Sequence, residues 1–83
     1  GSKNLTKSDL NIYPNPANNV ITISSLGNFD LLQIKDLLGK TVHEKSISKL
    51  NNTTIDIQGL STGTYLLNLV GPANRTSRKI VIE

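Results

Sequence analysis

The clearest alternation of apolar and polar side chains lies in residues 63–70. Tyr65, Leu67 and Leu69 are separated there by single residues, the period of two expected of a strand with one buried face. Gly63, just before this run, provides the backbone freedom that a change of direction needs. Tyr65 can bury its ring while its hydroxyl group bonds a nearby backbone carbonyl, as in a tyrosine corner. We therefore predict a central strand here.

Other short runs show the same alternation, and no segment carries apolar residues at helical spacing over three turns. Seven short strands separated by turn residues predict an all-β fold, an antiparallel sandwich of two sheets. The expected strands are residues 10–13, 20–24, 31–36, 41–45, 53–57, 63–70 and 76–82.

Two turns between these strands have a specific chemistry. Pro14 and Pro16 flank Asn15, so two backbone donors are missing and two φ angles are fixed, which predicts an extended corner. Asp36 and Gly39 fit the first and last positions of a type I turn with a bulge, in which the glycine takes a positive φ.

The strand pattern also predicts which side chains face the core. Isoleucines and leucines at alternate positions are expected to be buried, and the basic residues between them solvated. The expected buried residues are Ile21, Ile23, Leu32, Ile34 and Val42, and the expected solvated lysines, which also protect sheet edges, are Lys35, Lys40, Lys45 and Lys49.

Length and composition fit one small domain. The 83 residues include no cysteine, so disulfides and thiolate metal sites are excluded. The net charge of +3 comes without interleaved aromatic residues, which argues against a nucleic-acid surface. No apolar run is long enough for a membrane helix, so we expect no direct membrane insertion. We expect residues 1–9 to be a tag scar and linker remnant, and residues 10–83 to form the domain.

Residues with catalytic potential are few. His43 is the only histidine and is expected to be an exposed strand residue, and the carboxylates are scattered among turns and strand faces. The sequence contains no phosphate-binding glycine loop and no metal-ligand spacing. We therefore predict no catalytic, cofactor or metal site, and a protein that is not an enzyme.

The last predicted strand is apolar with a basic shoulder, Lys79-Ile80-Val81-Ile82, and is followed by Glu83. One interpretation is that this strand only completes a sheet. The other is that a partner recognises it, because a terminal strand can be offered for edge addition.

Four motifs in this order resemble the type A C-terminal sorting domain of the type IX secretion system of Bacteroidetes. They are Tyr13-Pro14-Asn15-Pro16-Ala17; Ile34-Lys35-Asp36-Leu37-Leu38-Gly39-Lys40; Ile55-Asp56-Ile57 with Leu60-Ser61-Thr62-Gly63-Thr64-Tyr65; and Lys79-Ile80-Val81-Ile82. The resemblance covers residues 10–83. It departs from the pattern at Glu83, where such domains often end on a basic or polar residue.

The resemblance implies a seven-stranded immunoglobulin-like antiparallel β-sandwich that serves as the secretion signal of an upstream cargo domain in the same chain. Its partners would be outer-membrane translocon and shuttle components and a sortase-like peptidase that removes the domain. The cargo would pass through the periplasm and reach the outer membrane, the cell surface or the medium. The recognition residues implied are Tyr13, Pro14, Asn15, Pro16, Gly39, Gly63, Tyr65, Lys79, Ile80, Val81, Ile82 and Glu83.

Two other functions remain open from the residues alone. One is a non-catalytic carbohydrate-binding or spacer module of an extracellular enzyme, for which Tyr13 and Phe29 would be the available aromatic rings. The other is a homotypic assembly module that uses an open edge strand.

Overall fold

Seven strands make up the regular structure of the described residues in a computed structural model of the chain. The structure describes residues 10–14, 16–24, 27 and 29–83, so the predicted linker at residues 1–9 and Asn15 lie outside the described residues. No helix occurs in this described part. The strands are β1 (Asn11–Tyr13), β2 (Val20–Ser24), β3 (Leu31–Lys35), β4 (Thr41–Ser46), β5 (Asn52–Asp56), β6 (Gly63–Val70) and β7 (Arg75–Ile82). The predicted strands are confirmed to within one residue at each end.

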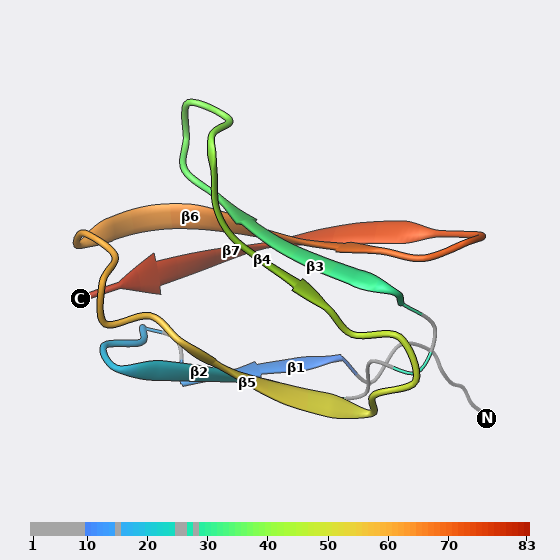
Figure 1. Cartoon of the computed structure of the whole chain (residues 1–83). Coiled ribbons are helices and arrows are strands. Elements are labelled where there is room, and N and C mark those ends of the chain that lie inside the picture. Colours follow the sequence, from blue (N-terminus) through green and yellow to red (C-terminus); the bar gives the residue numbers. More distant parts are fainter. Residues whose placement is uncertain (1–9, 15, 25–26, 28) are drawn as a thin grey trace, which may run out of the picture.

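The strands form two antiparallel sheets that face each other (Figure 1). The smaller sheet has the order β1-β2-β5 and the larger one the order β4-β3-β6-β7. β6 lies between β3 and β7, which confirms the prediction of a central strand. This is the sandwich architecture of immunoglobulin-like domains, with the fourth strand paired to the third in the larger sheet.

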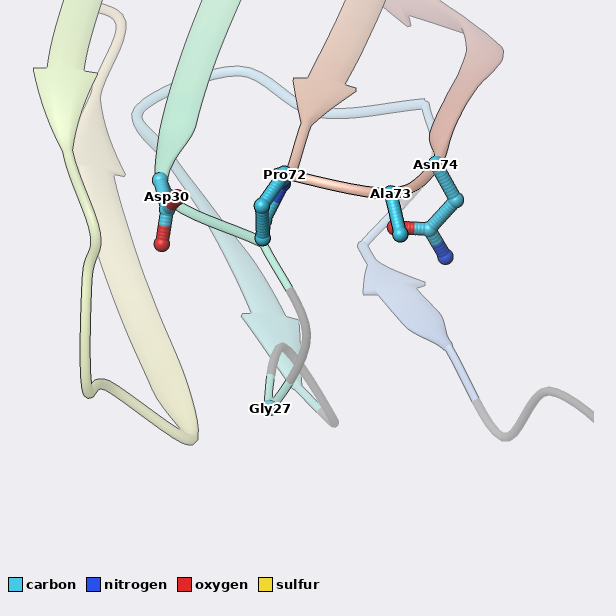
Figure 2. A pocket seen from close by; sticks show the side chains of 5 residues that line it. All are labelled: Gly27, Asp30, Pro72, Ala73 and Asn74. Carbon is cyan, nitrogen blue, oxygen red and sulfur yellow. The ribbon is translucent and has the colours of Figure 1, made fainter.

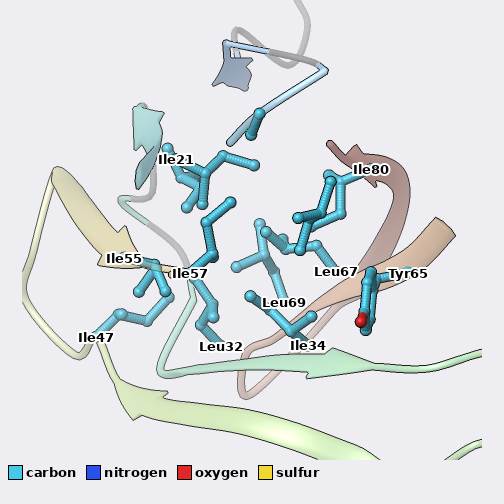
Figure 3. Close-up of a cluster of buried hydrophobic side chains, with 13 residues drawn as sticks. Ile21, Leu32, Ile34, Ile47, Ile55, Ile57, Tyr65, Leu67, Leu69 and Ile80 are labelled. Carbon is cyan, nitrogen blue, oxygen red and sulfur yellow. The ribbon is translucent and has the colours of Figure 1, made fainter. Parts of the chain in front are cut away.

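The core lies between the two sheets and consists almost entirely of branched aliphatic side chains (Figure 3). The expected pairs Ile21 and Ile23, and Leu32 and Ile34, are all fully buried. Tyr65 contributes the only aromatic ring of the buried cluster. Ile47, in the connection between β4 and β5, is fully buried although the alternation did not predict it.

A β-bulge at Val42 reverses the expected faces of β4 from His43 onward. The pairing of β3 with β4 shifts between Ile34 and Lys35, so that Ile34 lies opposite His43 while Lys35 lies opposite Thr41. Val42 is the extra residue and packs partly against the core, as predicted. Because one extra residue changes the alternation, His43 is half-buried and its prediction as an exposed residue was wrong.

The prediction for Lys45 was wrong for the same reason. It lies opposite Leu32 on the core-facing side of β4 and is half-buried, not solvated as predicted. Its ammonium group donates a 2.6 Å hydrogen bond to Oγ1 of Thr53 on β5. This bond joins the two sheets and satisfies a threonine that is itself buried.

Two predicted local motifs are confirmed. The Tyr65 hydroxyl group donates a 2.6 Å hydrogen bond to the carbonyl oxygen of Ser61, which makes a tyrosine corner. In the turn between β3 and β4, Gly39 has a φ of 91° and its backbone N–H bonds the carbonyl oxygen of Asp36 at 3.0 Å. A glycine accepts this positive φ without the steric cost that a side chain would add.

Candidate functional site

The terminal strand β7 lies at one edge of the larger sheet and pairs with β6 along its whole length. Ile80 and Ile82 point into the core and are fully buried, whereas Lys79 and Glu83 are exposed and Val81 is half-buried. The strand is therefore both a part of the core and a source of exposed side chains.

The proline corner follows β1. Its first peptide bond, Tyr13-Pro14, is cis, and Tyr13, Pro14 and Pro16 are exposed. Ala17, directly after the prolines, is almost completely buried. Its burial was not predicted; a single small residue within a polar turn gives only a weak signal.

The corner and the terminal strand meet through the backbone of Ala17. The N–H of Ala17 donates to the carbonyl oxygen of Val81 at 2.8 Å, and the N–H of Glu83 donates to the carbonyl oxygen of Ala17 at 2.7 Å. Ala17 thereby forms a parallel bridge with Ile82. We call this arrangement of Ala17 with residues 81–83 the corner–strand junction.

The junction changes the prediction that the terminal strand is offered for edge addition. The outward-facing backbone groups of Val81 and Glu83 already bond Ala17. A partner strand could pair there only by displacing the corner. Recognition at this end of the strand would thus depend on exposed side chains.

Two more of the predicted recognition residues border the junction from the side of β6. Gly63 lies opposite Ile82 and Tyr65 opposite Ile80 in the antiparallel pairing of β6 with β7. The corner, the start of β6 and the end of β7 thus form one end of the sandwich. Gly39 is not part of this group, because it lies at the tip of the β3–β4 hairpin, which projects from the sheet in Figure 1.

A shallow hollow of about 410 Å³ lies at the opposite end of β7 (Figure 2). It lies between the β2–β3 and β6–β7 connections and is lined by Gly27, Asp30, Pro72, Ala73 and Asn74. Asp30 is the only titratable residue in this lining. Within the described residues there is no group of three or more histidine, cysteine, aspartate or glutamate side chains that could hold a metal ion.

The aromatic rings bear on the carbohydrate-binding alternative. Phe29 packs against the core and Tyr65 belongs to it, whereas the Tyr13 side chain is 51% exposed. A flat sugar-binding platform with several exposed rings is therefore not present in this chain, whose three rings are all described.

Comparison with known proteins places the chain in a family. Residues 11–83 match the family model of the secretion system C-terminal sorting domain, and the chain belongs to this family. A comparison with curated proteins gives no significant match. The predicted resemblance is confirmed, and the chain is a C-terminal sorting signal of the type IX secretion system by its family. Cargo with such a domain is secreted to the cell surface or beyond.

A solved structure shares the fold. It is from a study of PorZ, described as an essential bacterial surface component of the type-IX secretion system of Porphyromonas gingivalis. The two folds agree with a TM-score of 0.77 at 17% sequence identity, over 90% of this chain and 11% of the PorZ chain. In the described part of the present chain, no helix has the length and apolar character needed to span a membrane.

Proposed function

We propose that the end of the sandwich around the corner–strand junction is the surface that the type IX outer-membrane translocon and its shuttle components recognise. The cargo domain upstream in the same chain passes through the periplasm with this domain folded. The observation that supports this proposal is the junction itself, because the proline corner and the terminal strand are distant in sequence and touch through Ala17.

The exposed side chains at this end are the proposed points of contact. Tyr13, directly before the prolines of the corner, and Glu83, directly after β7, are both exposed. Lys79 is exposed two residues before Val81 on β7. The buried residues Ile80, Ile82 and Tyr65 hold the strand in place, and Gly63 accommodates the start of β6 with a φ of 153°.

A sortase-like peptidase then removes the domain by cutting in or before residues 3–9. The domain is the substrate of this reaction and supplies no catalytic group to it. Mass spectrometry of the secreted cargo tests this step, because the new C-terminus of the cargo should fall upstream of β1. A secreted cargo that keeps residues 10–83 would contradict removal.

An export assay tests the recognition step. We would fuse residues 10–83 to a reporter directed to the periplasm of a bacterium with a type IX system, and measure the reporter in the medium and on the cell surface. The fusion should leave the periplasm. A folded fusion that stays there would refute the proposal.

Point substitutions separate recognition from stability in this assay. A deletion of residues 79–83 would remove two core isoleucines and would unfold the domain as well. Lys79→Ala changes an exposed side chain near the junction, and Arg75→Ala changes an exposed cation at the other end of the same strand. Lys79→Ala should lower export at an unchanged melting temperature, and Arg75→Ala should not. Equal export by the two variants would argue against recognition at the junction.

A further inference from the structure

The tip of the β3–β4 hairpin carries two leucines that contribute nothing to the core. Leu37 is 68% exposed and Leu38 is 94% exposed, the highest values among the large hydrophobic residues that the structure describes. Turn positions usually carry polar residues or glycine. Folding therefore does not explain why leucines occupy this turn, which projects away from both sheets in Figure 1.

The backbone of this tip is held by hydrogen bonds within the turn. Oδ1 of Asp36 accepts from the N–H groups of Leu38 and Lys40, both at 2.9 Å. The N–H of Gly39 donates to the carbonyl oxygen of Asp36, and the N–H of Asp36 donates to the carbonyl oxygen of Lys40. An apolar environment penalises unpaired backbone donors, and these bonds pair the N–H groups of Asp36, Leu38, Gly39 and Lys40, which lowers the cost of bringing the turn into one.

Two lysines flank the turn that carries the leucines. Lys35 and Lys40 lie directly before and after the turn. Lys35 is opposite Leu66, and Leu66 is opposite Lys79, so these three side chains share the outer face of the larger sheet. The one acid of the turn, Asp36, uses a carboxylate oxygen for the two backbone bonds. The hairpin tip thus combines two exposed leucines with the ammonium groups of the lysines on either side of the turn.

We propose that this hairpin tip is a contact site for an anionic lipid surface. Leu37 and Leu38 enter the boundary between head groups and acyl chains, and Lys35 and Lys40 lie at the level of the lipid phosphates. Two leucine side chains offer on the order of 200 Å² of apolar surface, well below the roughly 800 Å² per partner of a stable protein interface. A membrane surface accepts such a small insertion, since electrostatic attraction adds to it.

This contact is peripheral. It differs from the membrane-spanning insertion that the sequence argues against, because two residues reach only the interfacial layer. The two sites share the neighbourhood of Lys79, which lies on the same sheet face as Lys35. Lipid contact is therefore measured with substitutions in residues 35–40, which change no residue of the corner–strand junction.

A tryptophan at the tip provides a direct test, because the chain contains no tryptophan. We would prepare Leu38→Trp, with Val20→Trp as a matched control at a valine that is 41% exposed on the smaller sheet. With mixed phosphatidylcholine and phosphatidylglycerol vesicles, the emission of Leu38→Trp should shift to shorter wavelength, and brominated lipids should quench it. Emission from Val20→Trp should not change. Equal responses from the two variants, or none from Leu38→Trp, would overturn the proposal.

Sedimentation with vesicles then measures the separate contributions in the tryptophan-free chain. Replacing both leucines by serine should lower the vesicle binding constant at least about ten-fold. Lys35→Gln and Lys40→Gln should each lower it roughly five-fold at low salt. Binding should weaken at high salt and in vesicles of phosphatidylcholine alone. A serine variant that binds vesicles as well as the unmodified chain would refute the lipid site. The lipid site is also refuted if the unmodified chain binds no vesicles. A loss of reporter export in the serine variant would in that case assign the tip to a protein contact.

Discussion

The tyrosine corner gives the sharpest test of the fold. Tyr65→Phe removes one oxygen atom and keeps the ring, which is only 7% exposed. The lost hydroxyl group makes a 2.6 Å hydrogen bond to the carbonyl oxygen of Ser61, at the connection that leads into β6. Because the core contacts of the ring remain, the change in stability isolates this hydrogen bond.

The expected magnitude follows from the surroundings of the acceptor. A hydrogen bond within a protein contributes about 1 kcal/mol net, and more is lost when the partner is left buried and unpaired. The hydrogen bond is only partly buried and Ser61 is an exposed residue, so we expect water to reach its carbonyl oxygen in the variant. The cost should therefore stay near 1 kcal/mol, which in a domain of this size lowers the melting temperature by roughly 4–8 °C.

Thermal unfolding followed by circular dichroism measures this change. The chain has one other tyrosine, and Tyr13→Phe is the matched control because the side chain of Tyr13 is about half exposed. Tyr13→Phe should leave the melting temperature within about 1 °C of the unmodified chain, as for most surface changes. If Tyr65→Phe is as stable as the unmodified chain, or if both variants lose the same amount, the corner does not hold β6 as described.

Three further experiments test the other motifs. Ala17→Leu overfills a buried site and should lower the free energy of unfolding by about 1–3 kcal/mol. The amide of Glu83, which bonds the carbonyl oxygen of Ala17, should then exchange faster, and an unchanged exchange rate would contradict the junction. Gly39→Ala should destabilise by about 1–2 kcal/mol in denaturant unfolding because of its positive φ, whereas Gly59→Ala, with similarly open space and no positive φ, should not. A double-mutant cycle of Lys45→Met and Thr53→Val should give a coupling of about 1 kcal/mol, and additive losses would show that the inter-sheet bond is not stabilising.

The strands and most of the core could be predicted because alternation reports burial directly. In β6, for example, Tyr65, Leu67 and Leu69 are buried at every second position as expected. Ile47 could not be predicted in this way, because it lies outside any strand and its neighbours show no alternation. Its burial depends on the path of the connection between the two sheets.

The faces of β4 could not be predicted because the alternation of apolar and polar residues gives no sign of the bulge at Val42. The sequence around Val42, His43 and Lys45 gives no sign of an extra residue in the pairing. Once the register shifts opposite Ile34, the next side chains exchange faces. A half-buried lysine then finds the Thr53 hydroxyl group as its partner.

The members of the candidate site were predicted as separate motifs and their contact was not. Pro14, Pro16 and the terminal strand each resemble a family motif, but no local signal links Ala17 to Ile82. Parallel pairing between distant segments depends on the complete topology. Which of these residues a receptor contacts stays a prediction until the export assay is done.

The placement of β7 also has a consequence for synthesis. Ile80 and Ile82 complete the core, and Ile82 pairs with both Gly63 and Ala17. A ribosome must therefore translate almost the whole domain before the sandwich can close. A product truncated upstream of β7 would not close its core and would be degraded by proteases. Only chains translated through β7 would therefore fold and persist.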